Sequence, residues 1–274
     1  MTEHTTPAAG EFLITKEHRR FAEFCDAVRR DRYIGLCYGP PGVGKTLSAR
    51  HYANWDALEH TDIFDPATLP PPTLVATCRT VVYTAPVSAT PGRVEREVLA
   101  LCHHLTNLIG QAEAHARGEE EYQFRFGNRN RTELLIVDEV DRLKMLGLEQ
   151  VRDFYDQDGL GVVLIGMPGI EKRLARYAQL YSRVGFVHAY RSLNDGEFQF
   201  ILAQTWRQLG SGFDLADFTD QEALTAVRRI TGGNFRLLRR LLAQISQILA
   251  INELRVVTKE VVETAREHLV IGAS

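Results

Sequence analysis

The feature that constrains this chain most is an eight-residue run, Gly39-Pro40-Pro41-Gly42-Val43-Gly44-Lys45-Thr46. It matches the pattern G-x-x-x-x-G-K-[ST], in which glycines let the backbone curl so that successive N–H groups converge on phosphate oxygens. An apolar run over residues 33–38 precedes it and a helical pattern begins at Lys45, as expected for the strand and helix that flank such a loop. Lys45 is predicted to reach the β- and γ-phosphates of ATP, and Thr46 to hold Mg²⁺.

An acidic pair, Asp138-Glu139, follows the apolar run 134–137 about ninety residues later. A phosphate-binding loop needs a neighbouring strand that ends in an acid beside the magnesium ion. Asp138 is predicted to support the Mg²⁺ shell, and Glu139 to polarise the water that attacks the γ-phosphate. Together with the loop, this pair predicts hydrolysis of ATP to ADP and phosphate.

Strands and helices alternate over most of the chain. Strands are predicted at 33–38, 80–84, 134–137, 161–165 and 185–190, with helices at 16–30, 45–55, 91–116, 146–156 and 168–180. This order predicts an α/β fold with a mainly parallel sheet sandwiched by helices. Residues 58–80 hold four prolines and are interpreted as a surface insertion that forms neither a helix nor a strand.

The pattern changes after Arg191, where helices are predicted at 195–209, 219–230, 234–251 and 258–270 with no strand among them. The sequence therefore predicts three parts: a flexible tail over 1–14, an α/β ATPase core over 15–191, and a small α-helical lid over 192–274.

Composition limits the partners and the compartment. The net charge is −3 and the pI is about 6.3, so any nucleic-acid surface has to be a local patch. The four cysteines form no CxxC pair, which favours buried thiols in a reducing compartment over zinc ligands. No secretory signal and no apolar run of membrane-spanning length is visible, so a cytoplasmic protein is expected.

Two arginines are placed to neutralise charge that develops during hydrolysis. Arg183 comes just before the last predicted strand, and Arg236 opens a helix of the predicted lid within Gly232-Gly233-Asn234-Phe235-Arg236. Arginine is the favoured counter-charge in phosphoryl transfer and is often supplied by a neighbouring subunit.

Taken together, the loop, the acidic pair and these two arginines resemble an AAA+ ATPase from about residue 16 to residue 270. The resemblance implies that Arg183 is an arginine finger and that Arg236 is the lid residue called sensor 2. One position departs from the family pattern, because Met167 stands where a polar sensor usually ends the fourth strand. A thioether cannot orient water through a strong hydrogen bond, so slow turnover is expected.

Within AAA+ proteins, the chain resembles the transposition ATPases TnsC, TniB, IstB and MuB, on the segments Asp138–Leu143 (DEVDRL) and Leu164–Pro168 (LIGMP). This resemblance implies a homo-oligomeric ring or helical filament that forms on target duplex DNA with ATP bound between subunits. The filament would recruit or activate a transposase, with a target-selection protein as a further partner, and hydrolysis would disassemble it. In TnsC-like proteins the segment after the second strand faces DNA. Sequence-independent phosphate contacts are therefore predicted first for Arg93, then for Arg96, and then for a loop that holds Arg117 or Arg125, Arg129 and Arg131.

Two other functions remain open at this point. An AAA+ switch ATPase that acts on protein partners without DNA would suit the weakly acidic composition and Met167. An initiator-like or clamp-loader-like ATPase shares parts of the same motifs. A helicase with two RecA-like domains does not fit, because about 80 residues remain after the first domain.

Overall fold

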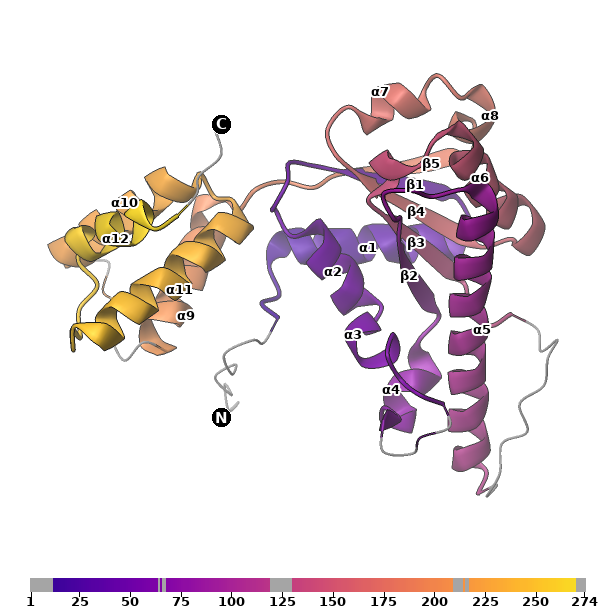
Figure 1. The fold of residues 1–274 in the computed structure, drawn as a ribbon, viewed down its shortest axis with the longest axis horizontal. Coiled ribbons are helices and arrows are strands. Elements are labelled where there is room, and N and C mark those ends of the chain that lie inside the picture. Colours follow the sequence, from indigo (N-terminus) through magenta and orange to yellow (C-terminus); the bar gives the residue numbers. More distant parts are fainter. Residues whose placement is uncertain are drawn as a thin grey trace. The chain divides into compact units, whose positions relative to one another are not determined.

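The computed structural model describes residues 12–63, 65, 68–118, 130–208, 214 and 217–269 (Figure 1). Most of the predicted tail, together with Arg125 and Arg129, lies outside these residues. The chain divides into two compact units. One contains residues 18–39 and 45–190, and is called the sheet unit below; the other contains residues 1–17, 40–44 and 191–274, and is called the lid unit.

The sheet unit is built on five parallel strands, which confirms the predicted α/β class. The strands are β1 (Ile34–Tyr38), β2 (Thr80–Thr84), β3 (Leu134–Asp138), β4 (Gly161–Gly166) and β5 (Val184–Ala189), in the spatial order β2-β3-β4-β1-β5. Every side chain of β3 and β4 is buried, because both strands have neighbours on each edge and helices on each face. Strand β5 forms an edge, and its burial alternates along the strand.

Helices cover both faces of this sheet. Figure 1 shows α1 (Lys16–Asp31) and α2 (Lys45–Tyr52) on one side, and α5 (Pro91–Ala116) and α6 (Met145–Asp158) on the other. A Cβ atom on Gly35 would lie 2.5 Å from Val28 and 2.7 Å from Phe24, so α1 packs closely on β1. Helix α5 starts where predicted, because Pro91 occupies its first turn and the Thr90 side chain accepts a hydrogen bond from the Arg93 N–H.

Two predicted helices are each interrupted. The helix predicted over 45–55 ends at Tyr52, since Asn54 has a left-handed backbone with φ of 50°, and a short helix α3 (Trp55–Leu58) follows. The helix predicted over 168–180 is two short helices, α7 (Ile170–Leu174) and α8 (Ala178–Tyr181), with a non-helical residue before the second.

The interpretation of 58–80 as neither helix nor strand is wrong in part. Helix α4 (Pro72–Thr77) lies there with Val75 buried. Proline fits the first turn of a helix because the N–H that it lacks would have no partner in that turn. The proline run therefore starts this helix.

The lid unit contains the four predicted helices: α9 (Asp195–Gln208), α10 (Phe218–Thr231), α11 (Phe235–Ile251) and α12 (Lys259–Glu267). They enclose a core that includes Phe198, Trp206 and Leu238. Side chains of Asp217, Asn234 and Thr258 cap α10, α11 and α12. Among the described residues, no helix is both long and apolar enough to span a membrane.

Candidate nucleotide site

The phosphate-binding loop connects the carboxyl end of β1 to α2, as predicted from the sequence. Gly42 and Gly44 have φ angles of 77° and 111°, a backbone region that residues with a Cβ atom rarely adopt. These conformations turn the loop toward the start of α2, where N–H groups and the helix dipole favour an anion.

Lys45, the first residue of α2, is buried, with 9% of its surface exposed. Its ammonium group donates a hydrogen bond of 2.5 Å to the carbonyl of Gly39. Burial lowers the pKa of Lys45, and the carboxylates of Asp138 and Glu139 act in the opposite direction. The side chain therefore holds a cation close to the loop, where a phosphate oxygen would be a stronger acceptor than a carbonyl.

Thr46 and Asp138 lie together. The Thr46 hydroxyl donates to Oδ2 of Asp138 at 2.6 Å, and Oδ1 of Asp138 accepts from the Glu139 N–H at 2.8 Å. Hydroxyl and carboxylate oxygens are hard ligands that suit Mg²⁺, which typically takes one or two protein oxygens and completes its shell with waters and substrate phosphates. The described residues include no cluster of three or more His, Cys, Asp or Glu side chains that would form a complete protein cage. This donor pair fits Mg²⁺ carried with ATP.

Glu139 has a left-handed backbone, with φ of 55° and ψ of 39°. Its side chain is 43% exposed and its carboxylate lies 3.7 Å from the Arg142 guanidinium. Directly after it, η2 (Val140–Arg142) turns the chain away from the strand. The turn leaves the Glu139 carboxylate accessible to solvent, as activation of a water requires.

A further acid, Asp141, lies near the predicted sensor position, although no role was expected for it from the sequence. Its Oδ2 accepts a hydrogen bond of 2.7 Å from the Met167 N–H, and its carbonyl accepts one of 2.9 Å from Arg173. A carboxylate therefore lies at the exit of β4, although the residue at the sensor position is apolar. The third acid of the DEVDRL segment was the sequence signal for it.

Within the lid unit, α11 contacts the phosphate-binding loop. The Asn234 side-chain amide donates to the Pro41 carbonyl at 2.8 Å, and the Arg236 N–H donates to the Gly42 carbonyl at 2.9 Å. Asn234 also caps α11 by accepting from the Arg236 N–H at 3.1 Å. The Arg236 Cα is thereby tied to the loop while its side chain is exposed. Sequence reasoning singled out Arg236 and gave Asn234 no role.

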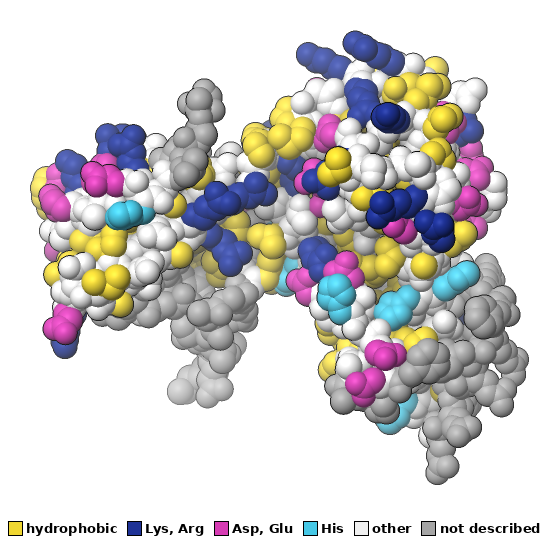
Figure 2. Space-filling model, viewed as in Figure 1, with side chains coloured by type: hydrophobic (Ala, Val, Ile, Leu, Met, Phe, Trp, Pro, Cys, Tyr) yellow, Lys and Arg dark blue, Asp and Glu magenta, His cyan; other side chains and the backbone are white. Residues whose placement is uncertain are grey.

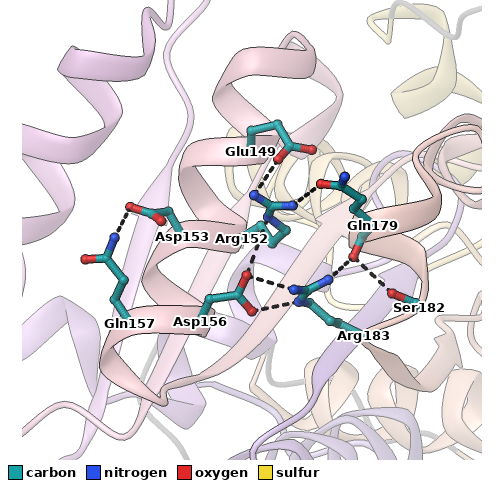
Figure 3. Close-up of polar contacts among 8 residues, drawn as sticks. All are labelled: Glu149, Arg152, Asp153, Asp156, Gln157, Gln179, Ser182 and Arg183. Atoms are coloured by element: carbon teal, nitrogen blue, oxygen red, sulfur yellow. Dashed lines mark hydrogen bonds and ion pairs between the residues drawn. The ribbon is translucent and has the colours of Figure 1, made fainter.

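Whereas the loop follows the carboxyl end of β1, Arg183 lies at the amino end of the parallel strands. It precedes β5, and its carbonyl accepts from the N–H of Ile34, the first residue of β1. The loop begins after the last residue of β1, so the two features are separated by the length of a strand, about 15 Å at 3.3 Å per residue. Figure 3 shows the guanidinium turned onto α6, where it donates to both oxygens of Asp156 at 2.7 and 2.9 Å.

The arginines predicted to contact DNA lie in different places. Arg93 forms an ion pair of 2.8 Å with Glu97 one helical turn along α5, whereas Arg96 is exposed. Arg117 caps the other end of α5, about 36 Å from Arg93 at 1.5 Å per residue, so α5 separates them. Arg131 is paired with Glu113. The face drawn in Figure 2 mixes Lys and Arg with Asp and Glu, in keeping with the net charge of −3.

Comparisons with known proteins place this geometry in a family. A family model described as an AAA domain matches residues 28–174, which is more than half of the chain. A potential ATP-binding protein of Staphylococcus aureus is 44% identical over 273 residues, which cover 95% of this chain and 97% of that protein. The Mu-like prophage FluMu DNA transposition protein B of Haemophilus influenzae is 25% identical over 240 residues, which cover 84% of this chain and 71% of that protein.

Solved structures show the same fold at lower sequence identity. The RuvB Holliday junction branch migration motor of Thermotoga maritima superposes with a TM-score of 0.58 at 16% identity, over 93% of this chain and 69% of that one. The Aeropyrum pernix ORC1 protein, solved in complex with DNA, gives a TM-score of 0.57 at 18% identity, over 92% and 64%. The AAA+ resemblance drawn from the sequence is thus confirmed, and the chain belongs to the AAA domain family of P-loop ATPases.

Proposed function

We propose that this ATPase assembles on target duplex DNA when it binds ATP, recruits or activates a transposase there, and is released by hydrolysis. The observation that carries the link to transposition is the similarity to the Haemophilus influenzae DNA transposition protein B over 84% of the chain. The position of Arg183 supports self-assembly, and the nucleotide site supports dependence on ATP.

In this proposal each part of the nucleotide site has a defined task. The loop N–H groups and Lys45 would bind the phosphates, and Thr46 and Asp138 would hold Mg²⁺, which would supply positive charge to the phosphates. Glu139 accepts a proton from, or orients, the water that attacks the γ-phosphate. Arg236 senses the bound nucleotide from the lid. With an apolar Met167 at the end of β4, we expect slow turnover, as suits an assembly that must persist.

The position of Arg183 is the support for self-assembly. A side chain about one strand length from the loop of its own chain cannot reach the phosphates bound there, because an arginine side chain spans roughly half that distance. A nucleotide held by a second copy is the target left to it. ATP would then join two subunits, and repetition of this head-to-tail contact builds a ring or a filament.

DNA binding is proposed for the amino end of α5, at the carboxyl edge of the sheet. Arg96 is the better candidate than Arg93, because Glu97 neutralises part of the Arg93 charge. One weak phosphate contact per subunit is enough when many subunits bind the same duplex. Such contacts are independent of sequence and sensitive to salt.

Fluorescence anisotropy of a labelled random-sequence duplex, titrated with protein under ATP, ADP and no nucleotide, tests the proposal. We expect cooperative binding that needs ATP and weakens with salt. Arg96→Ala should lower the slope of log affinity against log salt by about 1 per subunit, since each phosphate contact contributes about 0.9. Arg19→Ala is the matched control, because it removes the same charge from an exposed position on α1.

Absence of DNA binding in every nucleotide state would contradict the proposal and favour a switch ATPase that acts on protein partners. DNA binding with the same affinity in every nucleotide state would support the proposed DNA contact and contradict the proposed role of ATP in assembly. If a neighbouring gene encodes a transposase, its labelled product added to the ATP-bound complex would test recruitment directly.

A further inference from the structure

We propose that Asp156 is a positioning residue: in the isolated subunit it binds the Arg183 side chain and so competes with the nucleotide of a second copy for that side chain. This restraint on Arg183 is called the latch below. The inference rests on the proposed assembly, because it requires that Arg183 act on a nucleotide held by another copy of this chain.

The contacts of the guanidinium carry the argument. Nε and one terminal nitrogen of Arg183 donate to the two oxygens of Asp156 at 2.7 and 2.9 Å, and the other terminal nitrogen donates to the Gln179 carbonyl. All three nitrogens are thus engaged within the same chain (Figure 3). A planar guanidinium uses the same fork to bind carboxylate and phosphate, so a phosphate and Asp156 compete for it.

The helix that carries Asp156 supports this reading. Asp156 stands near the end of α6 and Arg183 follows α8, so the pair joins two elements through residues that are 27 positions apart. Both side chains are about one third exposed, at 31% and 33%. The pair is therefore open to exchange with a partner that arrives from solvent, and it is not a buried structural bridge.

A second arginine beside the pair has other partners that remain when the charge of Asp156 is removed. Arg152 lies 3.6 Å from Asp156, but it also pairs with Glu149 at 3.0 Å and donates to the Gln179 side chain. Loss of the Asp156 charge leaves Arg152 with these two partners. Asp156→Asn is accordingly expected to fold, and its main effect is to weaken the hold on Arg183.

The size of the effect follows from the exposure of the pair. Double-mutant measurements on exposed ion pairs correspond to changes of up to about fivefold in an equilibrium constant, and bidentate pairs lie at the upper end of that range. The protein concentration at half-maximal ATPase should therefore fall about three- to fivefold in Asp156→Asn. The midpoint for assembly with the slowly hydrolysed analogue ATPγS, measured by sedimentation velocity, should fall by the same factor.

The matched control is Asp153→Asn. Asp153 is on the same helix, and its carboxylate accepts from Gln157, so the substitution removes one negative charge without touching Arg183. We expect its titration curves to superpose on those of the wild-type chain. The double variant Asp156→Asn with Arg183→Ala should behave as Arg183→Ala does, because the latch has nothing left to hold.

The outcomes separate the two proposals. If Arg183→Ala abolishes ATPase but Asp156→Asn matches Asp153→Asn, the latch is refuted and assembly stands. If Asp156→Asn reaches half-maximal ATPase only at a higher protein concentration than the wild type, Asp156 helps to orient Arg183 toward the second copy. The latch is then also refuted. If ATPase does not depend on protein concentration and Arg183→Ala keeps it, the proposed assembly fails together with the latch.

Discussion

The left-handed backbone of Glu139 allows the strain at this residue to be separated from its chemistry. With φ of 55° and a Cβ atom, the residue occupies a region that costs about 1–2 kcal/mol for L-residues. Glycine removes that cost. It also destabilises the folded chain by about 0.5–1 kcal/mol, because it loses more conformational entropy on folding. The lost contact with Arg142, at 3.7 Å between partly exposed groups, contributes at most a few tenths of a kcal/mol.

The balance predicts that Glu139→Gly raises the free energy of unfolding by about 0.5 kcal/mol, within a range of about 0–1 kcal/mol, which corresponds to at most about 3 °C in melting temperature. The same change should lower the ATPase rate by about 10²–10⁴, the usual contribution of a general base. Glu139→Gln keeps the Cβ atom and the strain, so it should lose the same activity without any gain in stability. It should also still bind ATP and give longer-lived assemblies.

Chemical denaturation and thermal unfolding of the two variants without nucleotide measure the stability difference, and phosphate release measures the rate. The comparison between the variants cancels the loss of the carboxylate, which both share. If Glu139→Gly is less stable than Glu139→Gln, the strain argument is wrong. If Glu139→Gln keeps its rate within about tenfold of the wild type, the assignment of Glu139 to water activation is wrong.

Two further predictions concern stability. A Cβ atom on Gly39 would lie 2.2 Å from the Tyr190 carbonyl, so Gly39→Ala should destabilise the chain by about 1–3 kcal/mol in thermal unfolding. Gly92→Ala is the control, because its added Cβ would have no neighbour within 4 Å; we expect its stability to be unchanged or higher. Equal destabilisation by the two substitutions would contradict the expected clash at Gly39. Burial and the neighbouring His51 lower the pKa of His18 from 6.5 to about 4. The unfolded chain then binds more protons between these values, so stability should fall by about 2–3 kcal/mol as pH drops from 6.5 to 4. In His18→Phe this part of the pH dependence should vanish. If the difference in stability between His18→Phe and the wild type does not change with pH, His18 is not its cause.

Local sequence patterns were enough to predict the class of fold and the components of the nucleotide site. The loop Gly39–Thr46, the acidic pair at the end of β3 and the strand at 80–84 could be located because each depends on residues adjacent in the chain. Glycine conformations, apolar runs and helix caps are local properties, and they dictate local structure. Even so, the breaks at Asn54 and before α8 were missed, since periodicity continues across a single residue with non-helical dihedral angles.

The tertiary structure decided which distant groups meet. The bond from Met167 to Asp141, the bond from Asn234 to Pro41, and the pair of Arg183 with Asp156 each join residues 26 or more positions apart. No periodicity encodes such contacts, because they depend on the order of strands in the sheet and on where each helix ends. The parallel pairing of β5 with β1 likewise placed Arg183 at the amino end of the strands, opposite the end that carries its own nucleotide loop.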